Sequence, residues 1–543
     1  MLRSQPATLL IGQSGGATAV INASLAGIAS QAKLSGAWNR VLGLSHGIEG
    51  LFNHKFIDLT DVDDAHLNRV ARTPSAALGT GRFKLKDDDL ARAVLTMQTL
   101  GVTAFVYIGG NDSADTAHRI GKFARNINYD LSVMSVPKTI DNDLPDTDFC
   151  PGFPSVAKFL GNALRDATYD TIASPQINPV KFMEVMGRDA GWVAASCTVA
   201  FDEYDQHLLP LLLLPERAPE STDQVLEAIQ KDVDKRGFSM VVVPETMRTK
   251  GGHHFGGDEP DYVDSFGHPY FPSTGSAMTR LVREKLGLRA RYDKPGTSAR
   301  MSIALVSEVD LDMAWKLGAA AITAIDDGVT GKMTALKRVS SDPLDFEIQL
   351  VPQTNIANRV RHLDEEFIGK DGMSVTPKFH DYLRPLLGDS PFPRYARLDE
   401  PQHVEGTETP SLSRVRESTM VKNPQKDDLI SGDPEVGIEV SDGVDGVGVD
   451  AEGHEFDIKI GQDVLGSCGN KVGEVVDVLD NHIVVEKGFF NPEDIYIPKE
   501  EISSFDEYHL RLRVSRDEAM RADWDEEPEG SGDDSAAVDV SAP

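Results

Sequence analysis

Residues 105–113 read FVYIGGNDS, so that four apolar residues lead directly into two glycines and three polar side chains. A short apolar run that ends at glycine and precedes a helical pattern is typical of a buried parallel strand entering a βα loop. The same arrangement recurs at residues 8–16 and 133–143, and the alternation continues from about residue 6 to 340. It predicts an α/β fold of parallel βαβ units, with ligands bound where the strands end.

The chain carries a net charge of −32, distributed unevenly over its 543 residues. From residue 401 onward there are 12 Lys and Arg against 35 Asp and Glu. Because such a chain repels a phosphate backbone, we expect no nucleic-acid partner. No apolar run reaches the roughly 20 residues of a membrane span, and no signal-peptide pattern opens the chain, so we expect no membrane association. Three cysteines, too few for a disulfide framework, predict a cytoplasmic location.

The region after residue 404 has a different pattern. Residues 405–452 are rich in Gly, Ser, Thr, Asp and Glu, which predicts an acidic linker. Residues 453–526 alternate apolar and polar side chains between turn signals, which predicts a small all-β, barrel-like domain. Residues 527–543 predict a disordered acidic tail. The motifs within residues 461–490 resemble those of PRC-barrel-like domains, and a protein contact is the expected role.

Two of the strand-end loops are rich in glycine. Gly15 and Gly16 let backbone N–H groups approach an anion, and the following helix N-terminus adds partial positive charge. A tight turn without a ligand would also use these glycines, and neither the dinucleotide fingerprint nor a Walker loop is present. In the second loop, residues 109–113, Asp112 suits a metal site or excludes part of a larger ligand. The alternative for Asp112 is a helix N-cap.

The loop at residues 137–143, PKTIDND, contains two carboxylates and a lysine. A carboxylate beside bound phosphate can accept the proton of an attacking hydroxyl, while its neighbour orients a metal ion or water. Lys138 supplies a compact positive charge for a phosphoryl group in transfer. The alternative is an Asx-turn loop without a catalytic role. The three loops together predict phosphoryl transfer.

These segments resemble the phosphofructokinase family. The motifs that carry the resemblance are Ser14-Gly15-Gly16, residues 109–113, residues 138–143, Met186-Gly187-Arg188 and Val243-Pro244-Glu245. Their order and spacing match over about residues 6–390. The resemblance implies a phosphofructokinase-like core of two α/β lobes, which we place at residues 6–404.

The resemblance also implies a role for each matching residue. Asp141 is the base that takes the proton from the C1 hydroxyl of fructose 6-phosphate, and the catalytic set is completed by Lys138, Asp143 and Thr139. The residues implied in donor binding are Gly15, Gly16, Arg82, Gly110, Asn111, Asp112 and Ser113. Those implied in substrate binding are Thr139, Ile140, Asp141, Met186, Gly187, Arg188, Glu245, Arg291, Thr297 and Arg300. The implied cofactor is Mg²⁺ at Asp112 and Asp143, and the implied assembly is a homodimer or homotetramer.

The chain departs from the family pattern at three positions. Thr297 stands where His or Tyr is usual near the 6-phosphate, and Asn111 replaces a metal-associated aspartate. Pro179 stands where many relatives supply an arginine across a subunit interface, with Lys181 as a candidate substitute.

Asp112 and Lys138 stand where ATP-dependent members generally have glycine. A carboxylate at position 112 would repel the α-phosphate of a nucleotide, whereas Lys138 can neutralise charge on the transferring or leaving phosphate. The pair is therefore similar to the pyrophosphate-dependent branch, the diphosphate–fructose-6-phosphate 1-phosphotransferases. The alternatives are an ATP-dependent 6-phosphofructokinase, a lipid- or NAD-kinase-like enzyme, and a non-catalytic sugar-phosphate-sensing protein. A sensor would have no need of the base Asp141, which argues against the last.

Overall fold

The computed structural model describes residues 7–81, 85–263, 269–388 and 392–396. In the C-terminal region it describes residues 446–449, 455–458, 461–479, 481–487, 493–505, 509–522 and 524. The chain divides into two compact units, Met1–Asp399 and Glu400–Pro543. Among the described residues, no helix is both long and apolar enough to cross a membrane.

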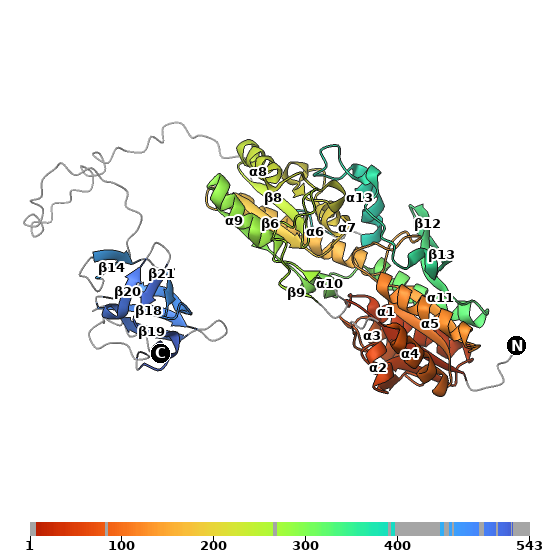
Figure 1. Cartoon of the computed structure of the whole chain (residues 1–543). Helices are drawn as coiled ribbons and strands as arrows, with labels where there is room; N and C mark the ends of the chain where they lie inside the picture. Colours follow the sequence, from red (N-terminus) through yellow and green to blue (C-terminus); the bar gives the residue numbers. More distant parts are fainter. Residues whose placement is uncertain are drawn as a thin grey trace, which may run out of the picture. The chain divides into compact units, whose positions relative to one another are not determined.

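The first lobe is built on a seven-stranded sheet with the strand order β13-β12-β5-β4-β1-β2-β3. Its edge hairpin, β12–β13, is labelled in Figure 1. Strands β1, β2, β4, β5 and β12 run parallel, as the sequence predicts. Their bounds are β1 Thr8–Gln13, β2 Arg40–Leu44, β3 Phe56–Asp58, β4 Val102–Gly109, β5 Ser132–Pro137, β12 Lys332–Ser341 and β13 Leu344–Pro352.

Both edges of this sheet carry an antiparallel strand in addition to the predicted parallel units. Strand β3 pairs antiparallel with β2, and β13 pairs antiparallel with β12. The β12–β13 hairpin lies where the sequence pattern fades, because half of β12 and most of β13 alternate between exposed and partly buried positions. An edge strand with one solvated face carries a weaker apolar signal than a central strand.

Alternate side chains of the central strands enter two separate cores. Leu9 and Val106 pack with helices α1 and α11 on one face, whereas Leu10 and Phe105 pack with α4 and α5 on the other. This alternation is the period of two expected for a strand buried on both faces. The helices of this lobe are α1 Ile21–Ser35, α2 Ile48–Phe52, α3 Asp64–Ala71, α4 Asp87–Thr99, α5 Asn111–Asn126 and α11 Glu308–Asp326.

The second lobe contains a four-stranded parallel sheet with the strand order β11-β6-β8-β7. A single apolar core joins the two sheets, because α6 contributes Phe153 and Leu160 to the same cluster as Val106 of β4 and Val242 of β8. The strands are β6 Val180–Val185, β7 Leu211–Leu212, β8 Ser239–Pro244 and β11 Ala290–Asp293, with the short hairpin β9 Tyr262–Val263 and β10 Pro269–Tyr270. The helices are α6 Phe153–Ala173, α7 Trp192–Ser196, α8 Thr222–Arg236, α9 Thr274–Leu286, α10 Thr297–Met301 and α13 Pro377–Leu383. Helix α12 Gln353–Ile356 follows β13 and packs on α5 of the first lobe.

The C-terminal unit has its own sheet of six strands, with the order β19-β18-β17-β16-β21-β20. Its core consists of side chains such as Val475, Ile483 and Leu510, so the predicted small all-β domain is confirmed. The predicted linker and tail fall almost entirely outside the described residues. The elements are β14 Gly446–Val449, β15 Glu455–Ile458, β16 Asp463–Leu465, β17 Lys471–Val478, β18 His482–Lys487, β19 Glu493–Pro498, β20 Ile502–Phe505, β21 His509–Leu512 and α15 Arg516–Ala519.

Candidate active site

Five polar loops meet in one cleft because they follow the carboxyl ends of parallel strands. Strands β1, β4 and β5 are neighbours in the first sheet, and β6 and β8 are neighbours in the second. The loops after these strands enclose a cleft of about 580 Å³. It is lined by Ser14, Gly15, Gly16, Gly110, Asn111, Asp112, Ser113, Lys138, Thr139, Ile140, Asp141, Asp143, Met186, Gly187, Arg188, Asp189, Glu245, Arg300, Asn358, Arg359 and Val360.

The first glycine loop allows other side chains to approach its backbone closely. Gly15 has a φ of 75°, a conformation that favours glycine, and its carbonyl accepts a 2.6 Å hydrogen bond from the Thr80 hydroxyl. Gly16 lies against Arg300, so that a β-carbon at Gly16 would stand 2.4 Å from the Arg300 Nη1 atom. Because glycine has no side chain, the guanidinium of Arg300 on α10 can reach the first loop.

The second loop presents the start of helix α5 to the cleft. Gly110 occupies the N-cap and Asp112 lies exposed in the first turn, so the alternative of Asp112 as the N-cap is wrong. The unpaired N–H groups of a first helical turn attract anions. Asp112 adds a negative charge at a position where phosphate would otherwise be favoured.

The carboxylate loop is held in place by the residue between its two aspartates. Asn142 is fully buried with a φ of 53°, and its side chain bonds the Tyr382 hydroxyl at 3.2 Å and the Cys150 backbone N–H at 2.9 Å. Because this side chain turns inward, Asp141 and Asp143 on either side of it both reach the cleft.

Burial raises the pKa of both aspartates above the ordinary range. For Asp141 the nearby charges of Asp143 and Glu245 raise the pKa further, whereas Lys138 and Arg188 oppose the shift. Lys138 is buried and donates a 2.8 Å hydrogen bond from Nζ to the Gly16 carbonyl, which fixes it between the first and third loops. A carboxyl with a raised pKa, held beside two cations, is suited to proton transfer.

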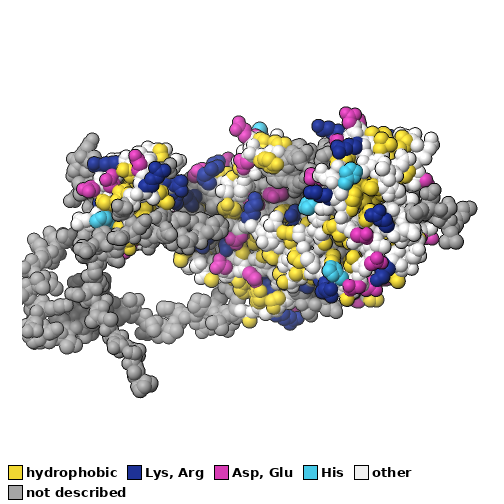
Figure 2. Space-filling view, turned by 90° about the horizontal axis from the view of Figure 1, so that it is seen from below, with side chains coloured by type: hydrophobic (Ala, Val, Ile, Leu, Met, Phe, Trp, Pro, Cys, Tyr) yellow, Lys and Arg dark blue, Asp and Glu magenta, His cyan; other side chains and the backbone are white. Residues whose placement is uncertain are grey.

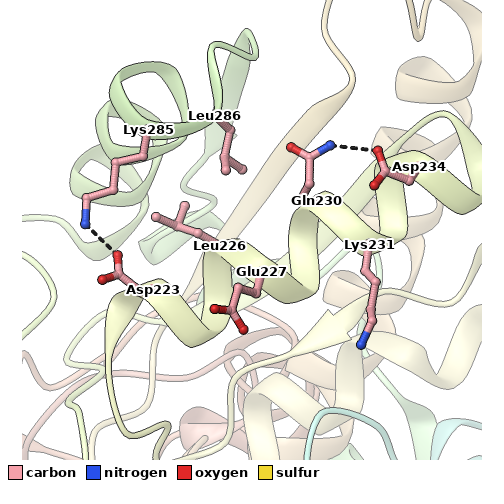
Figure 3. A pocket seen from close by; sticks show the side chains of 8 residues that line it. All are labelled: Asp223, Leu226, Glu227, Gln230, Lys231, Asp234, Lys285 and Leu286. Carbon is pink, nitrogen blue, oxygen red and sulfur yellow. Dashed lines mark hydrogen bonds and ion pairs between the residues drawn. The ribbon is translucent and has the colours of Figure 1, made fainter.

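A second hollow of about 370 Å³ lies between α8 and α9 (Figure 3). There Lys285 bonds Asp223 at 2.5 Å, and Gln230 bonds Asp234 at 2.7 Å. No glycine loop lines it, and its side chains come from helices rather than strand ends. On the face shown in Figure 2, basic and acidic side chains are interspersed over the described atoms. Because the strand-end cleft contains the glycine loops and the paired carboxylates, it is the candidate active site.

Comparison with known proteins agrees with this geometry. The model of the family described as phosphofructokinase matches residues 8–325, which is more than half of the chain. The chain belongs to the phosphofructokinase family.

Of three similar proteins, two are named for pyrophosphate as the donor and one for ATP. A pyrophosphate–fructose 6-phosphate 1-phosphotransferase of Xanthomonas campestris is 34% identical over 404 residues, covering 72% of this chain and 96% of the relative. The pyrophosphate-dependent phosphofructokinase structure from Nitrosospira multiformis has a TM-score of 0.64 at 30% identity and covers 74% of this chain and 94% of its own. An ATP-dependent 6-phosphofructokinase of Chloroflexus aurantiacus is 30% identical over 338 residues, covering 60% of this chain and 85% of the relative.

The phosphofructokinase cleft contains most of the residues that the sequence singles out, while four candidates either lie elsewhere or fall outside the described residues. Arg82 lies outside the described residues, although Thr80 places the preceding loop against Gly15. Arg291 on β11 and Thr297 at the start of α10 are exposed and do not line the cleft of their own chain. Lys181, the candidate substitute for a missing arginine, is bound to Asp170 at 2.8 Å and Asp293 at 3.5 Å.

A divalent cation suits the oxygen atoms on the α5 side of the phosphofructokinase cleft. Asn111 donates from Nδ2 to Asp143 Oδ2 at 3.1 Å, while its Oδ1 is buried and accepts no hydrogen bond within the described part of the chain. An amide oxygen and carboxylates form the hard donor set that Mg²⁺ prefers. No group of three or more His, Cys, Asp or Glu side chains in the described ranges could hold a metal by itself. Substrate phosphates and water would complete the coordination.

Four cleft residues were not found from the sequence: Asp189 and the segment Asn358–Val360. Asp189 directly follows the Met186-Gly187-Arg188 motif, so proximity in sequence could have indicated it. The segment 358–360 follows the β12–β13 hairpin and helix α12, and carries no motif. Only the folded chain brings it to the cleft.

Proposed function

We propose that the protein transfers a phosphoryl group from pyrophosphate to the C1 hydroxyl of fructose 6-phosphate. The products are fructose 1,6-bisphosphate and phosphate, and the reaction runs in both directions. The observation that carries this proposal is the presence of Asp112, Lys138 and Asp141 in one cleft. It is supported by the relatives named for the same reaction.

The reaction needs one proton acceptor and several cations. The C1 oxygen attacks one phosphorus of pyrophosphate, the bridging P–O bond breaks, and inorganic phosphate leaves. Asp141 accepts the hydroxyl proton, and Lys138 lies where negative charge develops on the phosphates. Mg²⁺, held through Asp143, Asp112 and the amide oxygen of Asn111, would offset phosphate charge when bound.

The second lobe supplies the sugar pocket in this proposal. Met186, Gly187 and Arg188 follow β6, and Glu245 follows β8, so all four face the first-lobe loops across the cleft. Burial raises the pKa of Glu245, whereas Lys294 and Arg188 oppose the shift. Arg291, Thr297 and Arg300 remain predicted contacts of the 6-phosphate. The exposed positions of Arg291 and Thr297 leave them available to a second copy, and the homodimer or homotetramer stays a prediction, as does the cytoplasmic location.

Pyrophosphate as the donor is tested by the wild-type enzyme with pyrophosphate and ATP at equal concentrations. We expect turnover of fructose 6-phosphate with pyrophosphate and a much lower kcat/KM with ATP. An ATP value equal to or above that of pyrophosphate would make the ATP-dependent alternative correct. Binding of fructose 6-phosphate without turnover from either donor would favour the sugar-phosphate sensor.

The C-terminal unit is proposed to be an independently folding appendage, comprising residues 453–526 after a linker at 405–452 and before a tail at 527–543. Its separate apolar core supports this, as does the division of the chain near residue 400. A PRC-barrel-like fold and a protein-contact role remain part of the proposal.

We expect a chain that ends near residue 440 to remain folded and to keep its kcat on fructose 6-phosphate, because every cleft residue precedes residue 361. Steady-state kinetics and thermal unfolding of the shortened and full chains would check this. A large loss of kcat or of folded protein would show that the β unit belongs to the catalytic core.

A further inference from the structure

The segment 358–360 forms a wall of the cleft that is fixed at both ends. Asn358, with a φ of 60°, donates from Nδ2 to Asp115 Oδ1 on helix α5 at 3.3 Å. Three residues later, the Arg361 backbone N–H donates to the carbonyl oxygen of Asp143 at 2.7 Å. The segment therefore spans from α5 to the carboxylate loop, on the side of the cleft where Asp112 lies in the first turn of the helix.

Arg361 makes this wall rigid. Its guanidinium donates to the carbonyl oxygens of Thr147 and Asp148 and lies 4.2 Å from the ring centre of Trp192. A partly buried arginine whose guanidinium has several partners is held in one geometry. The residues just before it are thus presented to the cleft by a fixed support rather than by a free loop.

Arg359 is the cation at the exposed face of this wall. Its side chain is exposed and lines the cleft, and within the described ranges its guanidinium makes no hydrogen bond or ion pair. Lys138 differs in this respect, since its ammonium group is bonded to the Gly16 carbonyl. A guanidinium that remains unbonded in a phosphate-binding cleft is suited to a ligand oxygen.

The position of Arg359 indicates which of the two phosphates of pyrophosphate it would contact. Asp141 must lie beside the attacking hydroxyl, and the cations that act on Asp141 are Lys138 and Arg188. The transferred phosphoryl group therefore belongs near these residues. In the proposed reaction the second phosphate would lie farther from the sugar, toward the α5 side. There Asn358 bonds Asp115 of α5, and Asp112 and Arg359 both line the cleft.

We propose that Arg359 binds the leaving phosphate of pyrophosphate and, in the reverse direction, inorganic phosphate. This inference rests on the proposed function and adds a specificity-determining residue to it. Asp112 repels a donor that extends past the second phosphate, while Arg359 attracts the singly or doubly charged terminal phosphate of pyrophosphate. The two residues would act as a pair that favours a short donor.

The test compares Arg359→Ala, Arg359→Lys and the control Arg125→Ala. Arg125 lies exposed in the last turn of α5, about 20 Å along the helix from Asp112, so its removal changes the net charge equally but not the cleft. The measurements are kcat and KM for pyrophosphate and fructose 6-phosphate, KM for phosphate in the reverse direction, and the calorimetric affinity for imidodiphosphate with Mg²⁺.

We expect Arg359→Ala to raise KM for pyrophosphate and for phosphate about tenfold and to weaken imidodiphosphate binding equally, as for loss of one charged hydrogen bond. KM for fructose 6-phosphate should stay within twofold, and Arg359→Lys should give an intermediate value because it keeps the charge but not the fork of donors. Arg125→Ala should match the wild type.

Three results would overturn the inference. The first is a pyrophosphate KM and imidodiphosphate affinity unchanged in Arg359→Ala. The second is a rise in KM for fructose 6-phosphate instead, which would assign Arg359 to the sugar phosphate. The third is an equal effect of Arg125→Ala, which would indicate general electrostatics. A wild-type enzyme that turns over only ATP would overturn the proposed function, whereas normal pyrophosphate turnover with an indifferent Arg359→Ala would overturn this inference alone.

Discussion

Asp141→Asn is expected to lower kcat by about 10²–10⁴-fold, the range for loss of a general acid or base. The amide has nearly the shape of the carboxylate but cannot take the proton of the C1 hydroxyl. Burial also raises the pKa of Asp141, and Lys138 and Arg188 lie close enough to oppose the shift. Steady-state assays at saturating pyrophosphate and fructose 6-phosphate would measure the change in kcat.

The matched control for this substitution is Asp146→Asn. Asp146 is exposed, lies three residues after Asp143, and does not line the cleft. Its φ is 58°, a conformation that asparagine also adopts, so the control should fold and keep the wild-type kcat. Fructose 6-phosphate should still bind to Asp141→Asn. A kcat within a few-fold of wild type in that variant would remove Asp141 from the role of base.

Lys138→Met is expected to lower kcat with pyrophosphate by about 10²–10³-fold, the scale for loss of one preorganised electrostatic contact in an active site. The ammonium group is buried and fixed by the Gly16 carbonyl, so its charge needs little reorganisation during transfer. The effect should fall on kcat more than on KM, because the interaction strengthens as charge develops. A change confined to KM would show that Lys138 only binds the ground state.

Asp112→Gly is expected to give measurable use of ATP, with a further gain when combined with Lys138→Gly. Asp112 is exposed in the first turn of α5, so its removal opens the cleft without a core cavity. Asp112→Asn separates charge from size, because it removes the repulsion of an α-phosphate but keeps the bulk. Parallel kcat/KM values for ATP and pyrophosphate would measure the shift. No gain in ATP turnover from the double variant would show that other residues select the donor.

The sequence alone was sufficient for the elements that repeat a local signal. Strands β1, β4 and β5 are apolar runs that end at glycine or proline, and such runs are buried on both faces wherever helices cover them. Parallel neighbours end at one edge of a sheet, so the motifs at residues 14–16, 109–113 and 138–143 could be expected to meet. The separate β unit was also predictable, because alternating side chains are a local pattern.

Other features depend on contacts between distant parts of the chain. Gly110 rather than Asp112 caps α5, a choice set by the backbone geometry where β4 ends. Arg300 reaches Gly16 only because α10 packs beside the first loop, where the backbone N–H of Ala19 bonds the Arg300 carbonyl at 3.0 Å.

Arg359 is the clearest example of a cleft residue that the sequence alone did not predict. It has no motif, and it enters the cleft because the antiparallel β12–β13 hairpin returns the chain to β5 and because Arg361 is held by the carbonyls of Thr147 and Asp148. The sequence by itself determined the buried central strands and the polar loops that follow them, since these depend on local apolar runs and glycines. The tertiary structure decided which distant segment closes the cleft, because long-range pairing depends on register and packing that no local pattern encodes.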